Sequence, residues 1–284
     1  MIPFLHIGWL TIPTFGLMVA TAIFVAGFII QAELNRRGMV LTKQRRLSKS
    51  ESKTKSDATP AKSDDGFLIV AMAGIAGLVG ARLYHVLETP AEFFADPKPM
   101  LLTRYGFAWF GGFLGGFLAL ILIAKHYKIP ILEFFDICAP AATVGYAIGR
   151  VGCLLSGDGD YGIPTTLSWG MSFPNGVVPT TDRVHPTPIY EFIVWMAIAA
   201  FLWHMGSKAL RGPKAKGEIF CNYLILTGLA RFLVEFLRIN PRSFFGLSNA
   251  QAASVVSIIF GAALLGVLKI RSAHSNRNTA SSSP

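Results

Sequence analysis

Charged residues are scarce in this chain: they make up 15% of its 284 residues, whereas hydrophobic residues make up 52%. A water-soluble domain of this size carries about 25% charged residues, so the composition argues against a soluble globular protein. A membrane-spanning helix needs about 20 mainly apolar residues, and such runs recur along the whole chain. The sequence therefore predicts an all-α, polytopic membrane protein with a single membrane domain over residues 1–284.

Cysteine is also rare, and basic clusters with interleaved aromatic residues are missing. Cys138, Cys153 and Cys221 lie in apolar surroundings without paired spacing, so neither a disulfide framework nor a zinc site is indicated. The net charge of +10 would suit a nucleic-acid-binding protein, but the positions of the charges decide the partner. We expect membrane lipid as a partner and no nucleic acid.

Seven apolar runs predict about seven transmembrane helices, separated by polar segments. Residues 35–65 are rich in lysine, arginine, serine and threonine and predict a basic, disordered cytoplasmic loop. Residues 156–187 are too long and polar for a hairpin, and they predict an extracytoplasmic segment with a small structure of its own. Residues 269–284 predict a disordered cytoplasmic tail. The predicted spans are about 14–34, 66–87, 107–124, 134–155, 188–205, 218–238 and 250–268.

The basic residues also predict the orientation in the membrane. Residues 1–14 contain no lysine or arginine, so the first run is expected to be an uncleaved helix with its N-terminus outside. With this orientation, most of the 26 lysines and arginines lie on the inner side, as the positive-inside rule requires. We therefore expect the N-terminus outside and the C-terminus inside.

Several arginines lie within or at the ends of the apolar runs, where an ionisable group costs about 2.5–3.5 kcal/mol near the centre. Arg231 and Glu235 are four residues apart, so one helical face can present both. That single pair leaves two or three of the arginines without an obvious acid in the spans, which predicts that an anion supplies the balance. The arginines concerned are Arg82, Arg150, Arg231 and Arg238.

Arginine suits a phosphate group because its planar fork donates two parallel hydrogen bonds and stays protonated in apolar surroundings. Gly149 and Gly152 flank Arg150 and would allow a ligand or a neighbouring helix to approach the backbone closely. The alternative is that these arginines reach the outer headgroup layer and bind lipid without specificity.

Five motifs follow one another along the predicted spans: GARLY at Gly80–Tyr84, the pair Gly111–Gly112, GRVG at Gly149–Gly152, HPTPIYE at His185–Glu191 and RFLVEFLR at Arg231–Arg238. In this order they make the sequence resemble the bacterial prolipoprotein diacylglyceryl transferase family, over most of the chain except the basic loop and the tail. Where the family signature continues Gly-Arg-x-Gly-Asn and then has a second Asn, this chain has Cys153 and Ser156. Phe110 stands where the family often has His or Tyr.

The resemblance implies transfer of the diacylglyceryl group of phosphatidylglycerol to the lipobox cysteine of a preprolipoprotein, without a bound metal or cofactor, in the bacterial cytoplasmic (inner) membrane. The reactive thiol then belongs to the substrate, so Cys153 is interpreted as a packing residue. Asp158, Asp160, His185 and Glu191 remain open as the base that takes the thiol proton. The implied catalytic residues are Arg150, Arg231, Glu235 and His185, and the implied substrate-binding residues are Arg150, Arg82, Gly149, Gly152, Gly111, Gly112, Tyr190, Glu191 and Arg238.

Two other classes stay open on the sequence alone. A lipid transporter could also use intramembrane arginines, although no inverted repeat relates the two halves of the chain. A catalytically inactive relative that binds anionic phospholipid is the stronger alternative, because Phe110, Cys153 and Ser156 depart from the family pattern.

Overall fold

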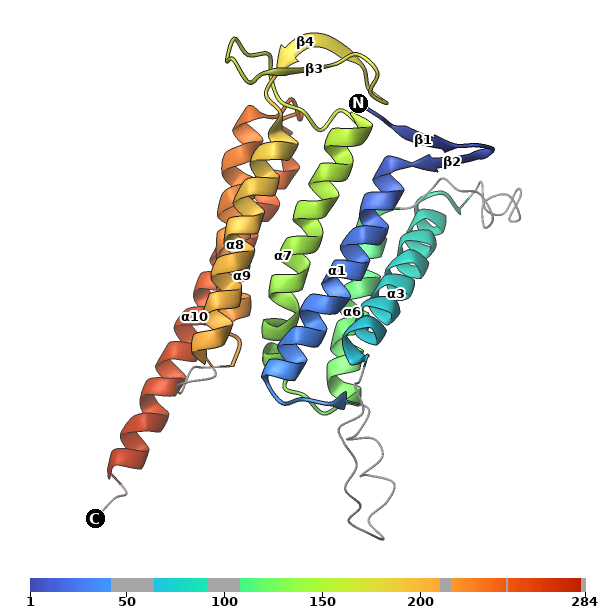
Figure 1. Ribbon diagram of the computed structural model, residues 1–284. Coiled ribbons are helices and arrows are strands. Elements are labelled where there is room, and N and C mark those ends of the chain that lie inside the picture. Colours follow the sequence, from blue (N-terminus) through green and yellow to red (C-terminus); the bar gives the residue numbers. More distant parts are fainter. Residues whose placement is uncertain (42–63, 91–107, 210–215, 244, 282–284) are drawn as a thin grey trace. The chain divides into compact units, whose positions relative to one another are not determined.

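The computed structural model describes residues 1–41, 64–90, 108–209, 216–243 and 245–281. Long helices dominate it, and two short β-hairpins accompany them (Figure 1). The elements are β1 (Phe4–Ile7), β2 (Leu10–Pro13), α1 (Thr14–Arg36), α3 (Asp65–Glu88), α6 (Trp109–His126), α7 (Ile131–Ser156), β3 (Met171–Phe173), β4 (Thr180–Val184), α8 (Thr187–Ala209), α9 (Glu218–Val234), the 3₁₀ turn η1 (Glu235–Leu237) and α10 (Asn249–Ser281).

The helices confirm the predicted class of a polytopic helical membrane protein. Among the described residues, six helices are long and apolar enough to cross a membrane. The remaining predicted span, 107–124, corresponds to α6, which is apolar but shorter. At a rise of about 1.5 Å per residue, a helix of this length reaches most of the way across a hydrocarbon core of about 30 Å. The orientation of the termini stays a prediction.

Two predicted segments differ from the structure or lie outside it. Helix α10 continues to Ser281, so residues 269–281 are helical and the prediction of a disordered tail from residue 269 was wrong for them. The physical reason is that no glycine or proline follows Gly266 until Pro284, so nothing in the sequence stops the helix. Most of the basic loop predicted at 35–65 lies outside the described residues.

The described chain falls into two units, one made of residues 27–134 and the other of residues 1–26 and 135–284. The prediction of a single membrane domain therefore stays a prediction. In the first unit, helices α3 and α6 pack along a line of glycines. A Cβ on Gly80 would lie 2.4 Å from the carbonyl oxygen of Gly111, and a Cβ on Gly111 would lie 2.3 Å from that of Gly80. Only glycine permits this approach.

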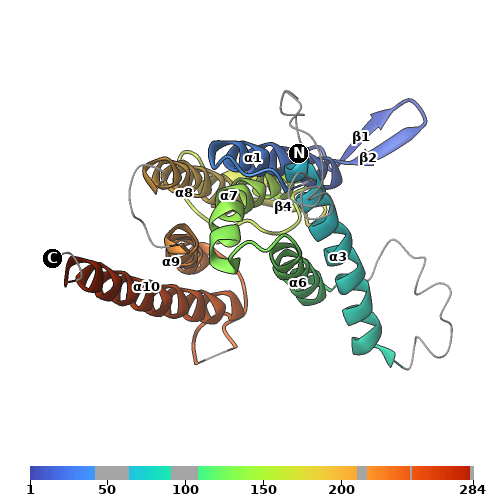
Figure 2. The ribbon, with the colours of Figure 1, turned by 90° about the horizontal axis from the view of Figure 1, so that it is seen from below.

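The second unit contains α7, α8, α9 and α10, which Figure 2 shows from below. Trp195, Ile198 and Leu202 of α8 form part of a buried apolar cluster with residues of α7 and α9. Asp136 of α7 accepts hydrogen bonds from the backbone N–H groups of Gly217 (2.7 Å) and Phe220 (2.8 Å). A carboxylate here satisfies free donors at the start of α9 and complements the helix dipole.

The segment predicted at 156–187 does form a small structure of its own. Strands β3 and β4 pair antiparallel, with Met171 opposite Val184 and Phe173 opposite Thr180. Tyr161, Phe173 and Val184 bury a small apolar cluster between the strands and the end of α7. In Figure 1 this hairpin lies at the end of the second unit where α7 ends and α8 begins.

Candidate functional site

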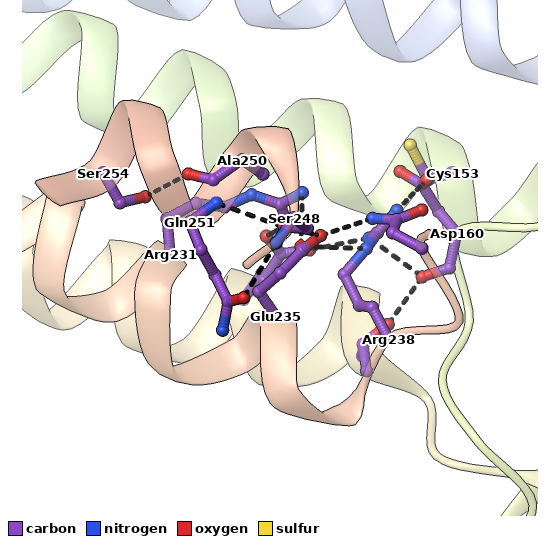
Figure 3. A network of polar contacts seen from close by, with 12 residues as sticks. Cys153, Asp160, Arg231, Glu235, Arg238, Ser248, Ala250, Gln251 and Ser254 are labelled. Carbon is purple, nitrogen blue, oxygen red and sulfur yellow. Dashed lines mark hydrogen bonds and ion pairs between the residues drawn. The ribbon is translucent and has the colours of Figure 1, made fainter. Parts of the chain in front are cut away.

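Three arginines and three acids meet where α7 ends, α8 begins and α9 ends, all within the second unit. Arg150 comes from α7, Glu191 from the first turns of α8, and Arg231 from α9. Glu235 and Arg238 follow at η1, one and two turns beyond Arg231. The sixth group, Asp160, comes from the polar segment after α7. Figure 3 shows part of this network at close range.

Glu191 lies at the centre of the network. Arg231 Nη1 donates to Glu191 Oε1 over 2.8 Å, and the Tyr146 hydroxyl donates to the same oxygen over 2.8 Å. Arg150 Nε lies 3.2 Å and Arg238 Nη1 3.6 Å from Glu191 Oε2. A single carboxylate therefore contacts all three arginines and holds their forks in one place.

Glu235 anchors the other side of Arg231. Arg231 Nη2 lies 2.9 Å from Glu235 Oε2, and Glu235 Oε1 accepts hydrogen bonds from Asn240 Nδ2 (2.7 Å) and the Ser248 hydroxyl (2.8 Å). Ser248 and Gln251 also form a capping box at the start of α10, with Ser248 N–H donating to Gln251 Oε1 and Gln251 N–H donating to Ser248 Oγ. The start of α10 is thus joined to the network (Figure 3).

Asp160 closes the network on the side of the polar segment. Its carboxylate accepts hydrogen bonds from Arg150 Nη1 and Arg238 Nη2. Burial alone raises the pKa of the Asp160 carboxyl, but the positive charges of Arg150 and Arg238 outweigh it and hold that pKa below its usual value. Asp160 is therefore ionised at neutral pH.

The expectation that two or three arginines lack an acid was wrong for the arginines of this site. Arg150, Arg231 and Arg238 face three carboxylates, so positive and negative groups are equal in number. Sequence spacing shows partners one turn apart on the same helix, such as Arg231 and Glu235, but it does not show partners on other segments. Asp160 and Glu191 are such partners. Arg82 belongs to the other unit, where its side chain is half-buried.

The network differs in how much of each side chain is exposed. Among the arginines, the exposed fraction is 20% for Arg231, 14% for Arg150 and 6% for Arg238. Among the acids it is 29% for Asp160, against 0% for Glu191 and 1% for Glu235. A ligand thus has access to Arg150, Arg231 and Asp160, whereas Arg238 and the two glutamates form the inner part.

The predicted site glycines have different surroundings. Gly149 has open space where a Cβ would be, as close approach of a ligand requires. At Gly152, a Cβ would lie 3.1 Å from Phe15 and Met18 of α1, so this glycine serves helix packing. Gly111 likewise faces α3 in the other unit, and a Cβ on Gly112 would make only ordinary contacts there. Substrate binding by Gly111 and Gly112 stays a prediction.

His185 and Tyr190 lie together, beside the network. His185 Nδ1 is 3.3 Å from the Tyr190 hydroxyl, which accepts a hydrogen bond from Trp169 Nε1 over 2.8 Å. Within the described part of the chain, no hydrogen bond or ion pair joins His185 to the three arginines or to Glu191. If His185 carries its proton on Nδ1 and donates it to Tyr190, Nε2 keeps the lone pair that a base needs.

Gly162 fixes the polar segment between the ends of α8 and α9. Its N–H donates to the carbonyl of His185 over 2.8 Å, and Ile163 N–H donates to that of Leu237 over 2.8 Å. A Cβ on Gly162 would lie 2.4 Å from the Leu237 carbonyl oxygen and 2.9 Å from His185 Cβ. This junction holds Asp160 near Arg238, because only one residue separates Asp160 from it.

Gly162→Ala is expected to lower the free energy of unfolding by about 1–3 kcal/mol, the usual cost of overpacking, and to reduce activity because the backbone at Leu237 and His185 must shift. Thermal unfolding in detergent and an activity assay measure the two effects. Gly145→Ala is the matched control, because Gly145 lies inside α7 with nothing within 4 Å of its missing Cβ. Equal melting temperatures for the two variants would contradict the role assigned to Gly162.

The Cys153 thiol, Asp158 and Asp160 offer three atoms within 4.8 Å of one another that could hold a metal ion. The donor set fits a metal poorly, since the Asp160 carboxylate is already bound by two guanidinium groups that a cation would have to displace. Cys153 is buried, and Arg150 Nη1 lies 3.7 Å from its sulfur.

Sequence reasoning missed Tyr146, Asn240, Ser248 and Gln251. Tyr146 had a signal, because it precedes Arg150 by one helical turn, and its ring lies beneath the Arg150 guanidinium at 4.7 Å. Ser248 and Gln251 had one too, since their spacing is that of a capping box. Asn240 had none.

Fold and site together define a polytopic membrane protein with an arginine-rich, partly accessible polar site among its helix ends. Comparison with known proteins identifies the family: residues 3–267 match the family model described as prolipoprotein diacylglyceryl transferase, and the chain belongs to this family.

Curated relatives agree with this assignment along most of the chain. A phosphatidylglycerol–prolipoprotein diacylglyceryl transferase of Geobacter sulfurreducens is 30% identical over 275 residues, which cover 93% of this chain and 92% of the relative. One of Clostridium tetani is 28% identical over 260 residues, which cover 90% of this chain and 93% of the relative. A third, of Clostridium perfringens, is 33% identical over 202 residues, covering 69% of this chain and 76% of the relative.

Proposed function

We infer that this protein transfers the diacylglyceryl group of phosphatidylglycerol to the cysteine thiol of a prolipoprotein. The observation that carries this inference is the family match over residues 3–267. The relatives named above span nearly the whole chain and carry the name of this activity. The protein is thus a membrane-bound transferase of lipoprotein biosynthesis. Its multi-pass helices agree with a membrane substrate, and the bacterial cytoplasmic membrane is the location we propose.

The reaction exchanges one bond for another. The substrate sulfur attacks the glyceryl carbon, a carbon–sulfur bond forms, and the bond from that carbon to the phosphate oxygen breaks. Glycerol phosphate leaves with the electron pair, and the thiol proton passes to a base. Two tasks follow for the protein: negative charge growing on the leaving phosphate must be stabilised, and the thiol must become a thiolate.

For the first task we propose Arg150 and Arg231. Glu191 contacts both side chains, and Glu235 also contacts that of Arg231. A part of each arginine side chain nevertheless stays exposed. Donors fixed in advance in this way need no reorganisation when charge develops on the phosphate. Gly149 leaves open space beside Arg150 for the lipid headgroup. Arg238 acts from the inner side, where it contacts Glu191 and donates to the backbone carbonyl of Asp160.

For the second task we propose His185, with Tyr190 fixing its ring. Glu191 and Asp160 are poorly suited as bases, because each is bound by two or more arginines. Asp158 Oδ1 accepts a hydrogen bond from the backbone N–H of Asp160 over 3.2 Å, which ties this side chain to its own turn. His185 keeps one ring nitrogen for the substrate in the tautomer described above, and histidine is the side chain that most often serves as a general base.

The direct test is transfer by the purified protein. Incubated with phosphatidylglycerol and a synthetic lipobox peptide, it should add the mass of one diacylglyceryl group to the peptide cysteine, and a peptide with serine in place of that cysteine should stay unchanged. No adduct under conditions where the Geobacter sulfurreducens relative modifies the peptide would indicate an inactive lipid-binding relative. Lipid movement across vesicles without an adduct would indicate a transporter.

A further inference from the structure

Asp160 differs from the other two acids of the network in every respect that matters for ligand exchange. It lies outside the helices, in a polar segment, whereas Glu191 belongs to α8 and Glu235 to η1. Its side chain is 29% exposed, and those of the two glutamates are buried. Its carboxylate bridges Arg150 and Arg238, and it is the part of the network's negative charge that a ligand can reach.

The charge count makes an added anion unfavourable but an exchanged one neutral. With Asp160 in place, three arginines face three carboxylates. A phosphodiester that simply joined this site would leave one negative charge uncompensated beside a membrane, which is costly. A phosphodiester that replaced the Asp160 carboxylate would bring the same single charge. Both groups also present oxygens that an arginine fork binds in the same manner.

The backbone around Asp160 is fixed, so the exchange needs only a side-chain rotation. The carbonyl oxygen of Asp160 accepts hydrogen bonds from the Thr187 hydroxyl (2.5 Å) and Arg238 Nη1 (3.1 Å). Thr187 is fully buried at the start of α8. The Asp160 carboxylate can thus leave the arginines for water while its main chain stays bound to Arg238.

Resting on the function proposed above, we propose that Asp160 is an internal substitute for the substrate phosphate. Its carboxylate binds the guanidinium groups of Arg150 and Arg238 while no substrate is bound. It dissociates from them when the phosphate of an anionic glycerolipid binds. It keeps the arginines paired between turnovers, and it weakens substrate affinity, because part of the binding energy is used to displace it. The ligand chemistry is a phosphate oxyanion on a glyceryl group.

The test compares the affinity of wild-type protein and Asp160→Asn for phosphatidylglycerol in nanodiscs of otherwise zwitterionic lipid, by titration followed with native mass spectrometry. If Asp160 occupies the arginines nine-tenths of the time, its removal should tighten binding about tenfold, since the apparent dissociation constant scales inversely with the competent fraction. Glycerol phosphate, which lacks acyl chains, should also bind about tenfold more tightly to Asp160→Asn than to the wild-type protein. Uncharged diacylglycerol should bind equally to both proteins.

Asp182→Asn is the matched control, because it removes the same charge from the exposed strand β4. A gain of at least about threefold for Asp160→Asn, absent in Asp182→Asn, supports the proposal. A smaller gain, or weaker binding, overturns it, because a purely structural Asp160 would loosen the arginines when removed. If Asp160→Asn does not fold, Asp160→Ser also removes the carboxylate and carries the same expectation.

Binding and transfer separate this proposal from the proposed function. Tighter binding by Asp160→Asn together with a wild-type protein that forms no adduct would support the exchange of anions and contradict the transferase. If the wild-type protein is active and Asp160→Asn shows no gain in affinity, the transferase is supported and the exchange of anions is contradicted. In an active enzyme, the half-saturating concentration of phosphatidylglycerol should also fall.

Discussion

Arg150→Ala and Arg231→Ala should each reduce diacylglyceryl transfer by at least about a hundredfold. Removing one donor that stabilises developing charge costs about 10²–10³ in rate in well-studied enzymes, and each arginine brings a full positive charge. The loss should appear in the turnover rate at saturating phosphatidylglycerol, because charge on the phosphate grows as the bond to carbon breaks. Mass spectrometry of the lipobox peptide measures it over a time course.

Arg183→Ala is the control for these two variants. Arg183 lies on strand β4, is exposed, and donates to the carbonyls of Ser168 and Gly170. Its loss therefore removes a positive charge from the polar segment after α7 but not from the network. Arg231→Lys adds a second comparison. It keeps the charge but cannot bridge Glu191 and Glu235 with a planar fork, so activity should stay low. Full transfer by Arg150→Ala and Arg231→Ala at wild-type expression would refute the assignment.

Glu191→Gln should destabilise the protein more than any exposed carboxyl-to-amide change, by about 3–5 kcal/mol. Breaking a buried ion pair by neutralising one partner costs this much, because the remaining charge stays buried without compensation. Glu191 contacts three arginines and is fully buried, so the full effect is expected. Transfer should fall as well, since Arg150 and Arg231 lose their common anchor.

Unfolding of purified Glu191→Gln, followed in detergent by heat or by added denaturing detergent, measures the first effect. Glu88→Gln at the exposed end of α3 should unfold like the wild-type protein. Tyr146→Phe provides an intermediate step, because it removes one hydrogen bond of 2.8 Å to Glu191 and leaves the charges in place. If Glu191→Gln unfolded like Glu88→Gln, the central role given to Glu191 would be wrong.

The helices could be predicted from the sequence because each span is encoded locally by a run of apolar residues. The predicted span 134–155 and the helix α7 (Ile131–Ser156) differ by a few residues at either end. The tail was predicted incorrectly for residues 269–281 because its serine-rich composition suggested disorder, whereas no glycine or proline interrupts α10 there. The N-terminal hairpin of β1 and β2 was missed, since strands of four residues give little periodicity.

The sequence predicted which residues belong to the site better than it predicted how they are arranged. Arg150, Arg231, Glu235 and Arg238 were named because arginines and acids are rare in apolar runs, and they do meet. Glu191 was assigned to the substrate, yet it lies at the centre of the arginines. Contacts between residues as far apart in sequence as Arg231 and Glu191 depend on how the helices pack. The spacing of residues in a single sequence does not predict that packing.

The closeness of Arg150 and Asp160 along the chain also bears on how the protein enters the membrane. Arg150 contacts Glu191 on α8 and shares that acid with Arg231 on α9, and both helices are synthesised later. Asp160 follows Arg150 by ten residues, so this pair can form once α7 and the turn after it have left the ribosome. The charge of Arg150 can then be compensated by Asp160 before α8 and α9, which complete its surroundings, have been synthesised.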